Sequence, residues 1–451
     1  MNYIAQNKFL VWVLILFILT RILIFNMIGY NNVLDFFHFS NTELLRTELI
    51  RTIFYNHSQP LLLNFLLGLL LKIFDGNIPN ISIAFYLIHL LLTLGIILIS
   101  YEIMKLFNLN KKIVYLILLL LVLNPNFLYY ENYSNPLYSH INCYLYFQLA
   151  YFILRYCLKM RPIDEIYIYI TLLIQSQIWG AWQPYLIIII FLYLRVFVNK
   201  INKRKFLIFF LFFILSLTPS IKNFTQFGVF ANSSWTGIYL STVLVPEPEC
   251  ANHWPNDEDI KNAKKKFNSE YFKQPSLYGP KSGTNNLAII SKSKRCFKYA
   301  ISKIIEDPLS YFKNRLIQFF ISHSKFSFEN VRGAPEIGKP KWIINYLDII
   351  DENFKRFKQL IIFIYMIGLY TLYFYITAKQ FKNNDRFRHY NLIIIIIHAH
   401  YLAITHLPNG HYENTRMVYG GFVFQLIFFC NLFNLKIISY LKILPKKNFL
   451  S

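Results

Sequence analysis

Long apolar runs recur along the whole chain, and they constrain its fold more than any other feature. Several are about 18 to 22 residues long, enough for a helix to cross about 30 Å of hydrocarbon. Hydrophobic residues make up 55% of the 451 residues and charged residues only 15%, whereas soluble domains carry about a quarter charged residues. We therefore expect an all-α polytopic integral membrane protein with about 10 to 11 transmembrane helices. The expected spans lie near residues 8–29, 82–100, 112–130, 136–156, 165–180, 182–198, 205–221, 357–378, 389–407 and 415–435.

The basic residues indicate how these spans are oriented. The formal net charge is +23, and much of it lies in short loops, where Lys and Arg mark the cytoplasmic side. No basic stretch with interleaved aromatics resembles a groove-reading module, so nucleic acid is not an expected partner. The first span follows Lys8 and lacks a small-residue cleavage site, which is typical of an uncleaved signal anchor. Loops 199–205 and 379–388 are basic and therefore cytoplasmic, which places the long segment 222–356 outside.

Hydropathy divides the chain into membrane modules around one large hydrophilic segment. That segment is long enough for a small folded domain, and helical spacing predicts an amphipathic helix near 296–321 that breaks at Asp307-Pro308. The apolar run 61–74 is too short to span, so we expect it to be interfacial or re-entrant. The expected parts are an N-terminal transmembrane module (1–221) with a first outer loop (30–60), an outer loop domain (222–356) and a C-terminal transmembrane module (357–451).

The five cysteines fall into two groups. Cys143, Cys157 and Cys430 lie in or beside apolar spans, where a thiol behaves as a small hydrophobe. Cys250 and Cys296 share the long hydrophilic segment. A disulfide between them requires that this segment face an oxidising compartment, and the sequence leaves both outcomes open.

Polar residues gather in four clusters that this orientation brings to the outer face. An acidic residue at the end of a membrane helix is costly to hold there without a function. The first cluster is the loop after the first span, with Asp35, His38, Glu43, Arg46, Glu48, Arg51 and His57. The second is N-P-N-F-L-Y-Y-E-N-Y at 124–133, with Tyr130 and Glu131, and the third is the exit segment 221–237, with Lys222. The fourth is H-L-P-N-G-H-Y-E-N-T-R-M at 406–417, with Glu413 and Arg416.

The order of these motifs resembles the glycosyltransferase C superfamily. The similarity is to its bacterial branch, related to protein O-mannosyltransferases and to the aminoarabinose transferase of lipid A. An acidic residue follows the first span, and H-x-x-P-L at 57–61 opens the next apolar run. N-P-x-x-L-Y-Y begins at 124, and x-x-N-x-x-x-F-G-x-F-x-x-S-S-x-x-G covers 221–237. A basic helix ending in Asp307-Pro308 and an E-x-x-R at 413–416 complete the series, which covers most of the chain.

The resemblance implies a helical bundle of that superfamily and an enzyme that transfers a sugar from a polyprenyl-phosphate donor. It implies Asp35 as catalytic base in a single inverting displacement on the outer face of the cytoplasmic membrane. The leaving phosphate needs cationic or donor partners, and the candidates are Arg416, His57, Arg51 and Lys222. Glu131 would orient the acceptor or share a divalent metal, Tyr130 would stack on the sugar, and Glu413 accompanies Arg416. The acceptor is a lipid, a glycan or a protein, and no cofactor is certain.

Structural roles compete with each of these assignments. Asp35 could cap a helix at the interface, Glu131 could pair with a nearby donor to stabilise the second outer loop, and Glu413 and Arg416 are spaced to form an i,i+3 ion pair. At the level of the whole chain, the alternatives are a polysaccharide polymerase or ligase, a lipid-linked saccharide transporter or flippase, and a non-catalytic assembly factor. A transporter would show paired charges near the bilayer midplane.

Overall fold

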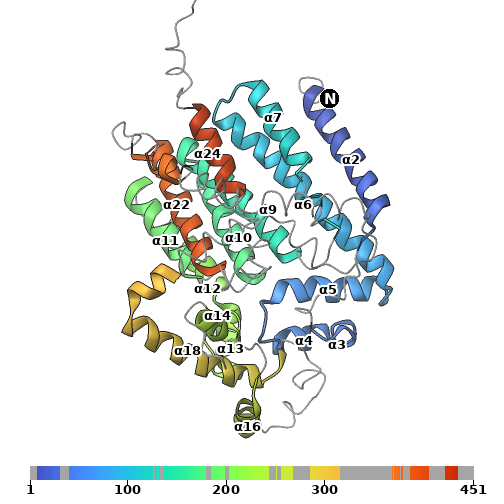
Figure 1. Cartoon of the computed structure of the whole chain (residues 1–451), viewed down its shortest axis with the longest axis vertical. Helices are drawn as coiled ribbons and strands as arrows, with labels where there is room; N and C mark the ends of the chain where they lie inside the picture. Colours follow the sequence, from blue (N-terminus) through green and yellow to red (C-terminus); the bar gives the residue numbers. More distant parts are fainter. Residues whose placement is uncertain are drawn as a thin grey trace, which may run out of the picture.

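The structure is a computed structural model, and among the residues that it describes the chain is helical, without a strand (Figure 1). It describes residues 8–30, 40–124, 127–128, 131–132, 137–178, 184–198, 203–242, 250, 255–267, 285–314, 368, 370–375, 377–378, 386–405 and 422–434. The helices are α2 (Lys8–Ile28), α3 (Thr42–Thr47), α4 (Leu49–Tyr55), α5 (Leu61–Ile73), α6 (Ile78–Leu106), α7 (Lys111–Val122), α9 (Leu137–Lys159), α10 (Pro162–Ile178), α11 (Tyr185–Tyr193), the π-helical turn η2 (Leu194–Val198), α12 (Lys203–Ser216), α13 (Thr218–Phe227), α14 (Thr236–Thr242), α16 (Asp257–Lys266), α18 (Ala288–Glu306), α22 (Arg386–Thr405) and α24 (Phe422–Asn434).

Two of these helices are long and apolar enough to cross a membrane, namely α6 and the Lys8–Asn26 part of α2. Helices α12 and α13 meet at a bend of 41° and together make a third candidate. Shorter apolar helices are α5, α11 with η2, and Val423–Phe433 of α24. The expected all-α class is confirmed for the described residues, while the full number of spans stays a prediction.

Helices α2, α6, α7 and α9 run along the long axis of the molecule and share one apolar core (Figure 1). Helix α7 ends at Val122, earlier than the expected 130. The cause is Pro125, because a proline disfavours helical geometry at the residue before it. Toward the other end of α9, Arg155 pairs with Asp164 of α10 at 3.0 Å, and Arg195 of η2 pairs with Glu165.

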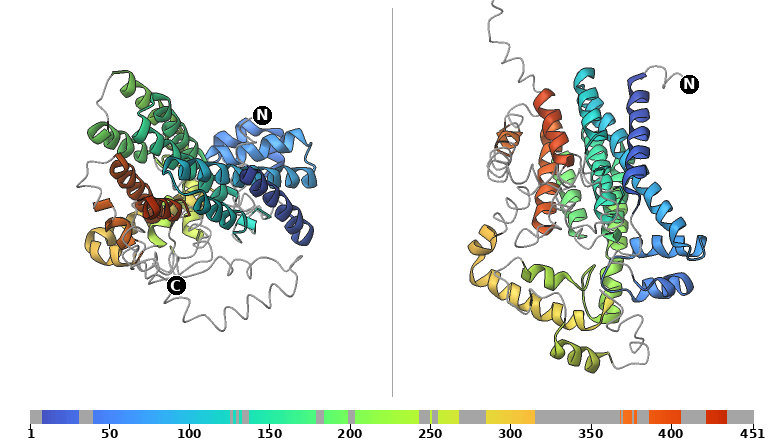
Figure 2. Two further views of the ribbon diagram at one scale, coloured as in Figure 1. Left: turned by 90° about the horizontal axis from the view of Figure 1, so that it is seen from above. Right: turned by 45° about the vertical axis from the view of Figure 1, so that its right-hand side comes forward.

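Helices α3, α4 and α5 lie across the direction of α2 and α6, as both Figure 1 and Figure 2 show. Helix α5 buries a leucine face of Leu63, Leu67 and Leu71 against Leu45 and Leu49 of α3 and α4. The short run 61–74 is therefore a helix that does not follow the bundle axis. Its other face is partly exposed, with Ile73 at 62%.

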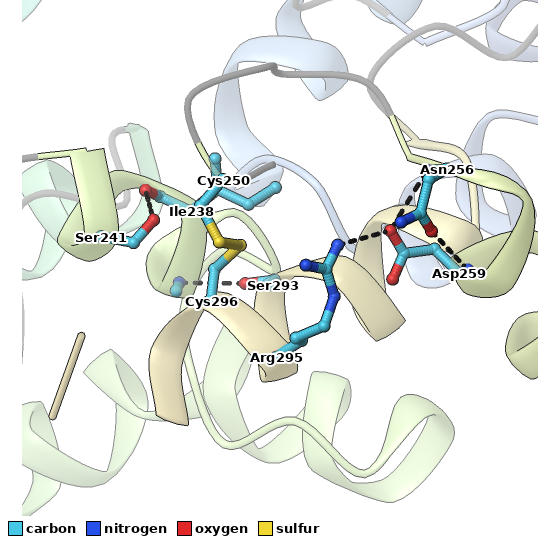
Figure 3. The surroundings of a disulfide bond; sticks show 9 residues. Ile238, Ser241, Cys250, Asn256, Asp259, Ser293, Arg295 and Cys296 are labelled. Atoms are coloured by element: carbon cyan, nitrogen blue, oxygen red, sulfur yellow. Dashed lines mark hydrogen bonds and ion pairs between the residues drawn. A yellow bond between two sulfur atoms is a disulfide. The ribbon is translucent and has the colours of Figure 1, made fainter. Parts of the chain in front are cut away.

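A separate unit of α13, α14, α16 and α18 lies at the end of the bundle opposite the start of α2 (Figure 1). Cys250 and Cys296 form a disulfide within it (Figure 3), the outcome that the sequence left open. Arg295 of α18 donates to Asp259 of α16 at 3.1 Å, and Asn256 and Asp259 form a capping box at the start of α16. We call this group of helices the disulfide unit.

The disulfide unit is completed by residues from the first outer loop. Leu44 and Tyr55, from α3 and α4, pack on its core beside Phe227. The unit is therefore built from two chain segments, and α13 runs through the expected boundary between 221 and 222. The amphipathic helix begins at Ala288, eight residues before the expected start, because Ala288, Ile289 and Ile290 are buried in the unit. It ends at Glu306, before Asp307-Pro308, as predicted.

Candidate functional site

The segment that carries Asp35 is held by hydrogen bonds at its Ser40 end and by aromatic contacts at its Tyr30 end. Residues 31–39, including Asp35, lie outside the described residues, and the chain is described up to Tyr30 and again from Ser40. Asp35 is five positions along the chain from each of these residues, so its Cα lies at most about 18 Å from either Cα. The two ends of the segment therefore define where a site that uses Asp35 can form.

The Ser40 end is fixed by two asparagines. The backbone N–H of Ser40 donates to Asn64 Oδ1 of α5 at 2.8 Å. Asn56 Nδ2 donates to Ser40 Oγ at 2.9 Å, and Asn56 Oδ1 accepts from the N–H of Ser58 at 3.1 Å. All four residues are buried, so these amides replace the water that the backbone would otherwise bind.

His57 joins three distant parts of the chain. Its backbone N–H donates to Asn285 Oδ1 at 2.8 Å, and its carbonyl accepts from the N–H of Ser234 at 2.9 Å. Its ring Nε2 lies 2.8 Å from the carbonyl of Asn285, and Nδ1 lies 2.7 Å from Ser234 Oγ. A carbonyl only accepts, so Nε2 carries the proton and Nδ1 accepts from the Ser234 hydroxyl. Both ring nitrogens are thus used within the protein.

Burial keeps His57 neutral. The side chain is fully buried, and desolvation, with a smaller contribution from the charge of Lys222, lowers the pKa of His57 to about 3. Lys222 Nζ itself donates to the carbonyl of Asn56. The structure therefore brings two of the predicted phosphate ligands together, with both engaged in contacts that hold the His57 junction.

Glu131 forms a buried, bidentate ion pair with Arg21 of α2. Arg21 Nε donates to Glu131 Oε2 at 2.8 Å and Nη2 donates to Oε1 at 2.9 Å. Arg21 Nη1 also donates to the carbonyl of Val122 at 2.6 Å. The exposed fractions of the two side chains are 3% and 0%. The pair ties the end of α7 and its following loop to α2.

This ion pair belongs to a larger buried group with side chains from α2, the middle of α6 and the start of α9. The Thr93 hydroxyl of α6 interacts with the Glu131 carboxylate, and Thr93 Oγ1 lies 3.0 Å from His140 Nε2 of α9. The ring of His140 lies 5.1 Å from that of His89, edge to face. Tyr30, where the described chain stops, lies 6.3 Å from His89 by ring centroids. The group thus extends from the ion pair to the start of segment 31–39.

The other predicted residues fall into two classes. Arg51 lies on α4 and pairs with Glu48 at 2.8 Å, with both side chains 44% exposed. Tyr130, Glu413 and Arg416 lie outside the described residues. Among the residues that are described, no group of three His, Cys, Asp or Glu side chains could hold a metal ion.

Sequence reasoning missed several residues that build these two groups. Arg21 had a visible signal, since an arginine inside an apolar span needs a partner in the bundle. Asn64, Ser234 and Asn285 had none, because their roles depend on contacts between segments far apart in the sequence.

Comparisons with protein-family models, with curated proteins and with solved structures find no match for this chain.

Proposed function

We propose that this protein is a membrane glycosyltransferase that moves a sugar from a polyprenyl-phosphate donor to an acceptor hydroxyl, with inversion. One observation carries the proposal, namely where the two described ends of the segment with Asp35 lie. Ser40 bonds Asn56 and Asn64 beside the His57 junction, and Tyr30 packs on Tyr86 and His89 next to the Arg21–Glu131 pair. Such anchoring suits a loop that must hold a catalytic carboxylate in a fixed place. The ordered sequence motifs supply the reaction class.

The proposed site faces the outside of the cytoplasmic membrane. The disulfide supports this placement, because disulfides persist in oxidising compartments. Lys105, Lys111 and Lys112 flank the connection from α6 to α7, at the end of the bundle away from the disulfide unit (Figure 1). Basic residues there support a cytoplasmic end. A multi-pass arrangement with α5 along the outer interface fits both features.

The proposed reaction is one displacement at the anomeric carbon. Asp35 takes the proton of the acceptor hydroxyl as that oxygen bonds to the anomeric carbon, and the bond from this carbon to the phosphate oxygen breaks. Polyprenyl phosphate leaves with the electron pair. Arg416 and Arg51 are the favoured phosphate partners, because a guanidinium binds phosphate in a bidentate manner. His57 and Lys222 support the loop in this account, since both are engaged at the junction.

A lipid-linked saccharide transporter or flippase is the second candidate. The observation that favours it is the buried Arg21–Glu131 pair, because charges inside a membrane bundle often mark a transport path. Nothing in the geometry favours a polysaccharide polymerase or ligase, which stays an alternative from the sequence alone.

Two assays on the same purified protein separate these candidates. In detergent, it is given a panel of polyprenyl-phosphate hexoses with labelled sugar, together with lipid, glycan and peptide acceptors. In sealed vesicles, movement of a fluorescent lipid-linked sugar between leaflets is measured. The proposal expects transfer in the first assay and no acceleration in the second. Leaflet exchange without transfer would replace the transferase with the transporter.

A further inference from the structure

A buried histidine and a half-buried tyrosine next to segment 31–39 have buried polar atoms without hydrogen-bond partners. His89 of α6 is fully buried, and neither of its ring nitrogens has a partner. The hydroxyl of Tyr30 is also buried without one. The two ring centroids lie 6.3 Å apart, with the ring planes tilted by 57°. Three unpartnered polar atoms therefore lie together where the described chain leaves α2.

These atoms are costly to keep in an apolar bundle. Folding removes each from water without returning a hydrogen bond, and simple packing would favour Phe at both positions. The neighbouring polar groups are committed elsewhere: the Tyr86 hydroxyl lies 3.4 Å from the carbonyl of Arg21, and His140 bonds Thr93 at 3.0 Å. Contacts within the described residues thus do not account for the polarity of Tyr30 and His89.

The chemistry of the pair favours an uncharged, hydroxylated ligand. An imidazole and a phenol together supply both donors and acceptors, and neither brings a permanent charge. The two charges of the same buried group, Arg21 and Glu131, neutralise each other. Aromatic faces surround the pair, with Tyr86 at 5.7 Å from Tyr30 and 4.8 Å from Phe25. Apolar walls with a few placed polar groups are typical of small-molecule sites, and a phosphate would instead need cations.

We propose that Tyr30 and His89 bind hydroxyl groups of the sugar that this protein transfers. The inference rests on the proposed function and deepens it, because it separates sugar recognition from phosphate binding. Tyr30 is five residues from Asp35, so the sugar would lie at the base of the loop that carries the proposed base.

The test compares binding of two probes, a short-chain polyprenyl-phosphate hexose and the same polyprenyl phosphate without sugar. Each is measured on wild type, His89→Phe and Tyr30→Phe, with the hexose chosen from a panel of glucose, galactose and mannose. Phe keeps an aromatic ring at both positions and removes the polar atoms. His400→Phe is the control, since His400 is a half-buried histidine of α22 whose Nδ1 lies 3.0 Å from the Tyr185 hydroxyl.

We expect wild type to prefer the hexose probe and each site variant to lose about tenfold in affinity for it. Affinity for the bare phosphate should not change in either variant. A second readout is thermal stability without ligand, which His89→Phe should raise because an unpartnered polar group is removed. The control should keep the preference for hexose.

The contrary outcomes are distinct. If wild type binds both probes equally, or if His89→Phe keeps the preference, the sugar-binding inference is wrong and the transferase proposal stands. If wild type binds neither probe, the proposed function fails, and the inference fails with it.

Discussion

Arg21 and Glu131 lie 110 residues apart in the sequence and meet in a buried bidentate ion pair, with two N–H···O contacts of 2.8 and 2.9 Å. The pair connects α2 to the loop after α7, and it lies in the same buried group as Tyr30 and His89. Its position explains how an arginine can be held inside an apolar helix. It also assigns Glu131 a structural partner beside any role toward the acceptor.

Removing one member of this pair should be strongly destabilising. Glu131→Gln leaves the Arg21 guanidinium buried beside a neutral amide, and we expect a loss of about 3 to 5 kcal/mol in the free energy of unfolding. Heat or denaturant unfolding of the purified wild type and variant measures this loss. The matched control is Glu48→Gln in the exposed pair with Arg51, where we expect less than about 1 kcal/mol.

A double variant separates structure from chemistry at Glu131. Arg21→Met with Glu131→Leu should restore most of the lost stability, because apolar side chains can replace a buried ion pair. A purely structural role predicts that the double variant transfers sugar. Equal stability of Glu131→Gln and Glu48→Gln would contradict the account.

His57 should make the protein less stable in acid. Its pKa is lowered to about 3 in the folded chain by burial, against about 6.5 when unfolded. Between these values the unfolded state binds a proton that the folded state does not, so stability falls as pH drops below about 6.5. The slope is about 1.4 kcal/mol per pH unit.

Thermal unfolding between pH 6.5 and 5 checks this prediction, because most carboxylates stay ionised in that window. His57→Gln should be less stable at neutral pH, since it cannot keep both ring hydrogen bonds. Its stability should also change less with pH than that of wild type. Parallel pH profiles for the two proteins would show that His57 does not titrate as described.

The Cys250–Cys296 bond should stabilise the disulfide unit. It closes a loop with a sequence separation of 46 residues, and chain entropy alone gives about 4 kcal/mol for such a loop. Cys250→Ala with Cys296→Ala should lower the unfolding temperature by the same amount as reduction of wild type. Alkylation of unfolded protein before and after reduction counts the thiols, and two additional thiols after reduction are expected.

Gly237 should not tolerate a side chain. A Cβ at this position would lie 1.9 Å from the Ser293 carbonyl oxygen and 2.8 Å from the Phe297 Cβ, where α14 packs against α18. Gly237→Ala should therefore cost about 1 to 3 kcal/mol through overpacking. Gly368→Ala is the control, because among the described residues no atom lies within 4 Å of its Cβ position. Limited proteolysis of the unit reports the difference, and equal protection would contradict the close approach.

The sequence predicted the helices better than their contacts. Apolar period and length located α6, α9, α10 and α22 to within a few residues, because burial in a bundle depends on local pattern. The short apolar run 61–74 forms the separate helix α5, which is too short to cross a membrane, as its length predicted. The early end of α7 depends on Pro125, a local signal that the apolar run obscured.

The candidate site was less predictable from sequence. The role of His57 depends on Ser234 and Asn285, which lie 177 and 228 residues away. No local pattern encodes such contacts, so the sequence did not predict the junction, and a phosphate-binding role for His57 stays a prediction. Tyr30 and His89 are single polar residues at apolar positions, and only their unpartnered burial distinguishes them from ordinary packing.

The central claim is tested most directly by the sugar-transfer rate of Asp35→Asn beside wild type and Glu43→Gln. Glu43 is the control, because it is a 65% exposed carboxylate of the same loop that pairs with Arg46 at 3.1 Å. The account predicts that Asp35→Asn stays folded, with its disulfide intact, and loses about 10²- to 10⁴-fold in rate. Glu43→Gln should transfer at the wild-type rate. Transfer by Asp35→Asn at the wild-type rate would contradict the account and remove Asp35 as the base.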